Sequence, residues 1–353
     1  MKTILLVFVH GFKGGLDTFG RFPQDLQESL STGSTLCDLE YRSIIYPPYE
    51  TKGDFQLAVS KLRDWLQETV IDIESERGTA SPTINGSVKI VLLAHSMGGL
   101  VSADVILAMH QDYAPADSFP HVIGLVALDS PMLGLAPSLW LNGAGDLFQR
   151  GKSLYDSAAG LTTIGSGLFA SKVIQGQKQK TIEESKEQEL EEKKKKKGGY
   201  LGWRGLTALS AVGALAAGGA LYAQKETLSR GYSWVSDHLE FIGTLRKSQE
   251  LSDRTIRLNS LDSVRFSCYY TLLTNKSSIV DGADRTFVLL PKGDLLKSRF
   301  HAQENVQASD EVAAHTGMFL REKNSGYDSM LRGIAGAIKE HWRCVFLCEV
   351  ERL

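Results

Sequence analysis

Residues 88–101 read VKIVLLAHSMGGLV and join two different hydrophobic patterns. Residues 88–94 are aliphatic apart from one lysine, which is typical of a strand buried on both faces of a parallel sheet. Residues 97–110 favour a helix, and small residues stand two positions before and two positions after Ser96. A serine on a sharp turn between a strand and a helix is a nucleophile elbow, in which the hydroxyl projects from the sheet edge. Ser96 is therefore the candidate nucleophile.

The same alternation of strand and helix continues on both sides of this stretch. Hydrophobic residues recur at three- and four-residue steps from Phe55 to Val70, which predicts an amphipathic helix, and residues 326–342 predict a closing helix. Hydrophobic runs predict further strands at residues 4–9, 42–46, 122–128, 265–274 and 285–291. Because alternating elements form right-handed crossovers, we expect an α/β fold with a mostly parallel, doubly wound sheet.

The alternation stops after residue 135. Residues 136–260 contain no clear strand, and residues 178–197 are a charged run that ends in consecutive lysines. Such runs are commonly solvated or disordered. We therefore predict one catalytic domain, formed by residues 1–135 and 261–353. A large, helical, partly disordered insertion over residues 136–260 would interrupt it, between the strand after the elbow helix and the last strands.

A second turn of interest follows the first predicted strand, at His10-Gly11-Phe12. In a fold with a nucleophile elbow, this position supplies a backbone amide to the oxyanion hole, beside the amide of the residue after the serine. The predicted oxyanion hole therefore consists of the Phe12 and Met97 amides. One such donor typically contributes about 10²–10³ in rate.

A serine hydroxyl needs a histidine that accepts its proton, and in this fold the histidine follows the last strands. His315 stands among small residues in VAAHTGMF, which predicts a loop able to reach Ser96. His301 falls in a probable strand and His341 on the closing helix, so we interpret both as structural. His10 and His95 flank the chemistry, and for them too a structural role is the simpler interpretation.

The acid that orients the histidine has three candidates. In folds with a nucleophile elbow, the acid usually lies in the loop after the penultimate strand, and Asp281 and Asp284 occupy this loop. Asp129, at the end of the strand that follows the elbow helix, is the alternative. Asp281 is our first choice, and the chain order serine, aspartate, histidine suits all three. Asp310 lies near His315 in sequence and is interpreted as part of its loop.

At these residues the chain resembles the α/β-hydrolase superfamily, and within it the serine esterase, lipase-like family that is common in fungi. The motifs VHGF, LLAHSMGGLV, ALDSPMLGL, RTFVLLP and AAHTGMF carry the resemblance. It covers residues 1–135 and 265–345, and the insertion looks similar only around residues 231–243. One departure is that the chain begins directly at the predicted oxyanion strand, without the two leading strands of many family enzymes. The resemblance implies ester hydrolysis through an acyl-enzyme, without a metal or diffusible cofactor.

Residues 205–223 have the length and composition of a segment that associates with a membrane. They carry no charge and would be about 28 Å long as a helix, close to the thickness of a hydrocarbon core. A single crossing would separate Ser96 from His315, so we expect an interfacial or hairpin lid instead. Residues 193–223, which begin with the lysines, could then contact a membrane surface. This apolar segment favours a lipid or other acyl ester as substrate.

Composition and charge limit the functional classes to which the protein can belong. The formal net charge of −2 gives no argument for nucleic-acid binding, and four cysteines are too few for a disulfide framework. The apolar start is too short for a secretory signal, so we expect an intracellular protein, either cytoplasmic or peripheral on an internal membrane. The main prediction is a serine esterase; an acyltransferase with the same triad and a non-catalytic membrane-associated scaffold are the alternatives. The sequence leaves the oligomeric state open.

Overall fold

The structure is a computed structural model that describes residues 2–11, 14–32, 39–49, 55–79, 81, 87–112, 119–137, 139, 244–245, 247–274 and 285–350. The strands among these residues are β1 (Lys2–Val9), β2 (Leu39–Ile45), β3 (Val88–His95), β4 (Val122–Leu128), β5 (Arg265–Leu273), β6 (Arg285–Thr286) and β7 (Phe300–Asn305). The helices are α1 (Phe22–Ser31), α2 (Phe55–Glu76), α3 (Met97–Asp112), α9 (Ser248–Asn259), α10 (Asp294–Lys297), α11 (Glu311–Thr316) and α12 (Tyr327–Val350).

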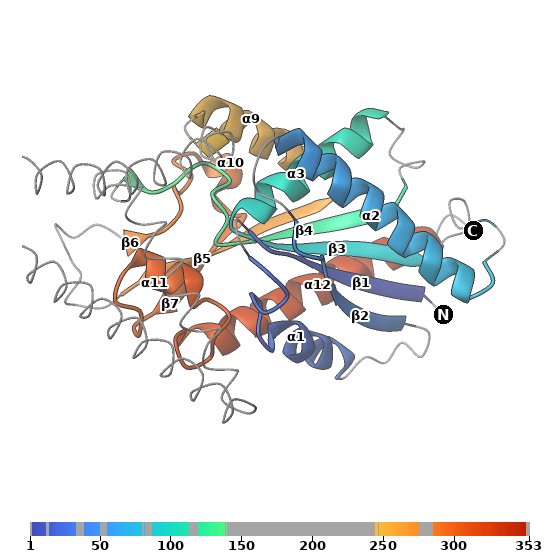
Figure 1. The fold of residues 1–353 in the computed structure, drawn as a ribbon, viewed down its shortest axis with the longest axis horizontal. Coiled ribbons are helices and arrows are strands. Elements are labelled where there is room, and N and C mark those ends of the chain that lie inside the picture. The colour runs from blue at the N-terminus through green and yellow to red at the C-terminus, as the bar shows by residue number, and fades with distance from the viewer. Residues whose placement is uncertain are drawn as a thin grey trace, which may run out of the picture. The chain divides into compact units, whose positions relative to one another are not determined.

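These strands form one sheet (Figure 1). Its order is β2-β1-β3-β4-β5-β6, and β7 pairs with β5. All neighbouring strands run parallel except β5 and β6, which are antiparallel. Strand β1 lies inside the sheet. The next strand of the chain, β2, pairs with one side of β1, and the following strands, β3, β4 and β5, are added on the other side. The structure thus confirms the predicted α/β fold with a mostly parallel, doubly wound sheet.

Helices cover both faces of the sheet (Figure 1). Helices α2, α3 and α9 pack on one face, and α1 and α12 pack on the other. Alternate side chains of β1 enter the two cores: Leu5, Val7 and Val9 on one side, and Ile4, Leu6 and Phe8 on the other. A strand buried on both faces must be hydrophobic at nearly every position, which explains the aliphatic runs of the sequence.

Helix α1 was not predicted from the sequence. Its hydrophobic residues Phe22, Leu26 and Leu30 recur every four positions and are fully buried. Pro23 stands in the first turn, where proline is favoured because its missing N–H has no helical partner there. The signal for this helix was therefore present, although it spans only ten residues.

The chain divides into two compact units, residues 1–154 with 235–353, and residues 155–234. The second unit lies outside the described residues, and with it the predicted lysine run and the apolar segment 205–223. Helix α9, which the sequence analysis assigned to the insertion, belongs to the first unit and contacts α3 and β5. Its Leu251 and Leu258 are fully buried in the core that α3 shares, so residues 248–259 are part of the unit that contains the sheet.

None of the helices in the described ranges has the length and the apolar character needed to cross a membrane.

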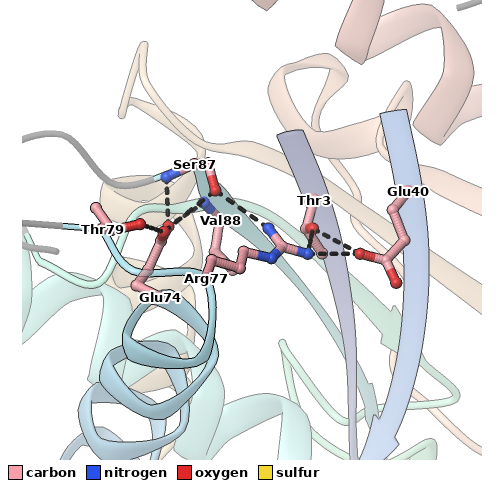
Figure 2. Close-up of polar contacts among 7 residues, drawn as sticks. All are labelled: Thr3, Glu40, Glu74, Arg77, Thr79, Ser87 and Val88. Carbon is pink, nitrogen blue, oxygen red and sulfur yellow. Dashed lines mark hydrogen bonds and ion pairs between the residues drawn. The ribbon is translucent and has the colours of Figure 1, made fainter. Parts of the chain in front are cut away.

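A polar network joins the end of α2 to the amino ends of the strands (Figure 2). Buried Glu74 accepts hydrogen bonds from the Val88 amide at 2.8 Å, the Thr79 hydroxyl at 2.6 Å and the Ser87 amide and hydroxyl. Burial raises the pKa of Glu74, but these hydrogen bonds together lower it more, so the net shift is downward. The charged carboxylate therefore fastens α2 to the start of β3, at the sheet end opposite to the elbow.

Candidate active site

The turn at Ser96 is a strained backbone position. Strand β3 ends at His95, α3 begins at Met97, and Ser96 between them has a φ angle of 56°. A non-glycine residue is rarely found in this left-handed region, and such strain persists only where the surrounding structure enforces it. Gly98 shows the crowding, since a Cβ atom there would lie 2.6 Å from the carbonyl oxygen of Val9. The small residue two positions after the serine is therefore required by the close approach of β1 to α3.

The loop after β1 also passes close to Ser96. A Cβ atom on Gly11 would lie 2.6 Å from the Cβ of Ser96 and 3.1 Å from its hydroxyl oxygen. The Gly14 amide donates a hydrogen bond to the Gly11 carbonyl at 3.1 Å. The His10 ring stacks on Tyr49 at 4.9 Å, and the Tyr49 hydroxyl donates to the His10 carbonyl at 3.0 Å. The described part of the predicted turn, His10 and Gly11, thus lies against the elbow.

Ser130, which follows the neighbouring strand β4, fixes the elbow. Its hydroxyl donates a hydrogen bond of 2.6 Å to the Ser96 carbonyl. Gly99 makes room for it, because a Cβ atom on Gly99 would lie only 2.0 Å from the Ser130 hydroxyl. The strand ends of β3 and β4 are therefore joined directly at the candidate nucleophile.

Asp129 follows β4 and is fully buried, with a φ angle of 45°. Its amide donates to the Tyr269 carbonyl at 2.7 Å, and its Oδ1 accepts from the Thr271 amide at 3.1 Å. Its Oδ2 lies 2.7 Å from Nδ1 of His315. A buried carboxylate requires such partners, because removing its charge from water is costly unless hydrogen bonds compensate. These contacts fix the direction in which Asp129 presents its second oxygen.

His315 lies in the last turn of α11, not in the loop that the sequence analysis predicted. Asp310 caps this short helix by accepting a hydrogen bond of 2.8 Å from the Ala313 amide. Arg285 of β6 forms a two-point ion pair with Glu311 in the first turn, at 2.9 and 2.7 Å. The cap and the ion pair explain why the small residues around His315 form a helix, and they fix its position relative to the sheet.

The hydrogen bond between His315 and Asp129 sets the roles of the two ring nitrogens. An ionised carboxylate only accepts hydrogen bonds, so Nδ1 of His315 carries the hydrogen. In the neutral ring Nε2 is then left with its lone pair, which is the state that a general base requires. The pair spans 186 positions of sequence and is almost completely shielded from solvent.

The structure places some of the predicted site residues together, and others lie outside the described residues. Ser96, Asp129 and His315 gather at the carboxyl ends of the parallel strands, and Met97 begins α3 with a buried side chain. Phe12, Asp281 and Asp284 lie outside the described residues. The first choice for the acid was Asp281, but Nδ1 of His315 is bonded to Asp129, which was the alternative. The reason is that β3 and β4 are direct neighbours, so the residue after β4 lies beside the elbow.

Two other histidines lie away from this pair. His301 lies on β7, where its ring packs against Tyr269 at 4.8 Å, in agreement with a structural role. His341 lies on α12, and its side chain is outside the described part of the structure. Among the described residues, no group of three or more His, Cys, Asp or Glu side chains could hold a metal ion.

The sequence analysis missed one contact of His315. The Phe287 ring lies parallel to the His315 ring, with 3.7 Å between centroids and 11° between planes. His95, interpreted as structural, stacks on His315 as well, at 4.4 Å and 27°. Phe287 follows β6 in a run of hydrophobic residues, and nothing in that run distinguishes it from an ordinary core residue.

The fold and this constellation of residues define the class of protein. A serine on a strained strand-to-helix turn, a mostly parallel sheet and a buried aspartate–histidine pair are the features of the α/β-hydrolase fold. Residues 1–190 match the family described as "Putative serine esterase (DUF676)", which is more than half of the chain. The chain therefore belongs to this family. A search among curated proteins found no match.

Solved structures with some similarity include a carboxylesterase and a phospholipase. A carboxylesterase from Nitrososphaera gargenis is 12% identical, with a TM-score of 0.39 over 96% of this chain and 91% of that one. MenH from S. aureus is 13% identical, with a TM-score of 0.35 over 96% and 94% of the two chains. Phospholipase PlaB from Legionella pneumophila is 17% identical, with a TM-score of 0.28 over 40% of this chain. That match spans only 27% of the phospholipase.

Proposed function

We propose that the protein is a serine hydrolase that cleaves carboxylic esters through an acyl-enzyme on Ser96. The observation that carries this proposal is the buried hydrogen bond of 2.7 Å between Asp129 and His315, formed beside a serine in strained backbone geometry. Together these two features match the serine, base and acid of a hydrolytic triad.

In the proposed reaction, the Ser96 oxygen attacks the ester carbonyl while Nε2 of His315 takes the hydroxyl proton. Asp129 keeps Nδ1 protonated and stabilises the resulting imidazolium. The imidazolium then gives its proton to the departing alcohol, and the acyl group remains on Ser96. Water, activated by the same histidine, attacks the acyl-enzyme and releases the carboxylic acid. The amides of Met97 and Phe12 would stabilise the negative oxygen of both tetrahedral intermediates.

The proposed reaction requires a contact between the Ser96 hydroxyl and the His315 ring. Within the described residues there is no hydrogen bond between the serine hydroxyl and the histidine ring. In unliganded hydrolases this contact is often long, and it shortens when substrate is bound. The proposal therefore rests on the fixed aspartate–histidine pair and the elbow, and it expects the serine–histidine contact to close around the substrate.

For the substrate class we propose a lipid or another ester with an apolar acyl chain. The support is the uncharged segment 205–223 in the insertion, next to the lysine run that begins at residue 193. Such a segment would lie at a lipid surface as part of a lid, with the lysines near anionic headgroups. A series of p-nitrophenyl esters with increasing acyl length, with and without anionic vesicles, tests this class. Turnover that falls with acyl length and does not respond to vesicles would contradict it.

Labelling of the purified full chain with a fluorophosphonate tests the main proposal. We expect covalent modification of Ser96, mapped by peptide mass spectrometry, and loss of p-nitrophenyl ester hydrolysis in proportion to labelling. Ser263→Ala is the matched control, because Ser263 contacts His110 far along α3 and should not affect labelling. A folded protein without label at Ser96 would overturn the proposal and favour the non-catalytic scaffold. Ester products with an added alcohol, in place of free acid, would show acyl transfer.

A further inference from the structure

The His315 ring lies between two other rings. Phe287 is 3.7 Å away and nearly parallel to it, and His95 is 4.4 Å away at 27°. Two flat rings at these distances cannot share one face of an imidazole without overlapping. They therefore occupy opposite faces, and we call His95 and Phe287 the ring clamp.

His95 also holds the backbone of the residue that it stacks on. Its Nε2 lies 3.2 Å from the carbonyl oxygen of His315. Because a carbonyl oxygen only accepts, Nε2 of His95 carries the hydrogen and donates it. The His95 ring is itself fixed by Phe319, which meets it edge-on at 5.1 Å and 80°. One side chain thus positions both the ring and the main chain of His315.

The charges around His95 favour its neutral form. Burial lowers the pKa of His95 well below its ordinary value, and positive charge on His315 or His10 would lower it further. The hydrogen bond to the His315 carbonyl raises the pKa of His95, but by less than burial lowers it. A neutral His95 can lie against His315 when His315 is positively charged during the reaction. The Phe287 ring on the other face attracts a cation through its π electrons.

We propose that His95 is a positioning residue for His315, which stacks on the imidazole and donates Nε2–H to its carbonyl so that the imidazole Nε2 is aimed at Ser96. This inference rests on the proposed hydrolase function of that site. The hydrogen bond to Asp129 fixes one nitrogen of the ring but leaves the ring free to rotate about that bond. Contacts on the two faces remove this rotation, and reactions at a catalytic centre are sensitive to such misplacement.

Three substitutions separate the two contacts of His95. His95→Phe keeps a stacked ring without the donor, His95→Gln keeps a donor without the ring, and His95→Leu removes both. We expect His95→Leu to lower kcat about 10²-fold, with Phe and Gln falling between it and the parent, because a misplacement of about 1 Å costs this much. KM should change by less than about twofold, since His95 contacts the base and not the substrate. A residue that only stabilised the fold would change the midpoint of unfolding without this selective loss of kcat.

His110→Gln is the matched control, because His110 lies on α3 and contacts Ser263 and its own helix. It should retain the parent kcat. The inference fails if the folded His95→Leu protein retains a kcat within about twofold of the parent. It fails separately from the proposed function, which is lost only if the unsubstituted protein neither hydrolyses p-nitrophenyl esters nor labels at Ser96.

A measurement on the unsubstituted protein covers the case in which the variants do not fold. Nitrogen-15 NMR of labelled histidine reports the tautomer and charge of each ring. We expect His95 to remain neutral with hydrogen on Nε2 from about pH 8 to about pH 5, the range in which ordinary histidines titrate. A His95 that gains charge in this range, or carries its hydrogen on Nδ1, would overturn the inference.

Discussion

The two ends of the central sheet are built on opposite principles. At the amino end, Glu74 and Arg77 bind backbone and side-chain partners through hydrogen bonds and an ion pair (Figure 2). At the carboxyl end, Ser96 and Asp129 have positive φ angles, and a buried carboxylate is paired with a buried histidine. Strained backbone costs stability, so a fold retains it where it serves another purpose. The comparison therefore predicts that substitutions at the carboxyl end change turnover, whereas substitutions at the amino end change stability.

The largest expected effect comes from Ser96→Ala. It removes the nucleophile, and knocking out such a residue costs about 10⁶ in kcat in hydrolases with a triad. Steady-state hydrolysis of a p-nitrophenyl ester measures the loss, and the midpoint of denaturant unfolding should stay near that of the parent. Comparable turnover in this variant would remove the distinction between the two ends of the sheet.

Asp129→Asn should be the next largest. The asparagine keeps the shape of the side chain but lets His315 adopt the wrong tautomer, which in a serine triad lowers kcat by about 10⁴. The measurement is kcat at several pH values, with fluorophosphonate labelling as a second readout. Asp310→Asn is a suitable comparison, because that residue caps α11 and does not touch the His315 ring. If Asp129→Asn retained most of its activity, another group, such as Asp281 or Asp284, would be the acid.

Glu74→Gln should act on stability and leave kcat unchanged. Glutamine loses the charged acceptor that binds two amides and two hydroxyls, a loss of about 1–3 kcal/mol in the free energy of unfolding. The pKa of Glu74 is lowered in the folded protein, so its contribution is complete above the ordinary glutamate pKa. It is lost as the pH falls through the folded value. Urea unfolding at neutral and acidic pH should therefore show a difference between parent and variant that shrinks at low pH.

Arg77→Ala should have the smallest effect. Arg77 contacts Glu40 and Thr3 through one nitrogen at 2.5 Å and Ser87 through another at 3.1 Å, but the Arg77–Glu40 ion pair is partly exposed to solvent. Exposed ion pairs contribute about 0–1 kcal/mol, because water screens them. We expect a loss of about this size in urea unfolding, reduced by added salt, and no change in ester turnover. A drop in kcat without a change in stability would contradict the comparison.

The fold could be predicted because its sequence signals are local. Residues 4–9 and 88–94 are aliphatic at nearly every position, because both faces of β1 and β3 are buried. The elbow was equally visible, since the turn around Ser96 needs small residues at a fixed spacing. The sequence analysis assigned α9 to the insertion. The reason is that this helix has charged residues beside its two buried leucines and lies in a stretch of sequence without predicted strands.

The site was predicted less completely, because its geometry depends on residues far apart in the chain. The choice between Asp129 and Asp281 requires knowledge of which strand lies beside β3, and loop position alone does not give this. Phe287 could not be selected, since it contacts His315 only after β6 has paired with β5. The short helix around His315 depends on the ion pair between Arg285 and Glu311, which is also a tertiary contact.

The order of the three central residues along the chain has a consequence for biosynthesis. A protein chain emerges from the ribosome with its amino end first, so Ser96 and Asp129, which directly follow β3 and β4, emerge early. His315 belongs to α11 and emerges only after β7. A nascent chain, or a fragment truncated before α11, would thus contain Ser96 and Asp129 but lack His315. In the proposed mechanism, such a chain has no base that can accept the serine proton. Reactivity at the serine would be withheld until α11 has been synthesised.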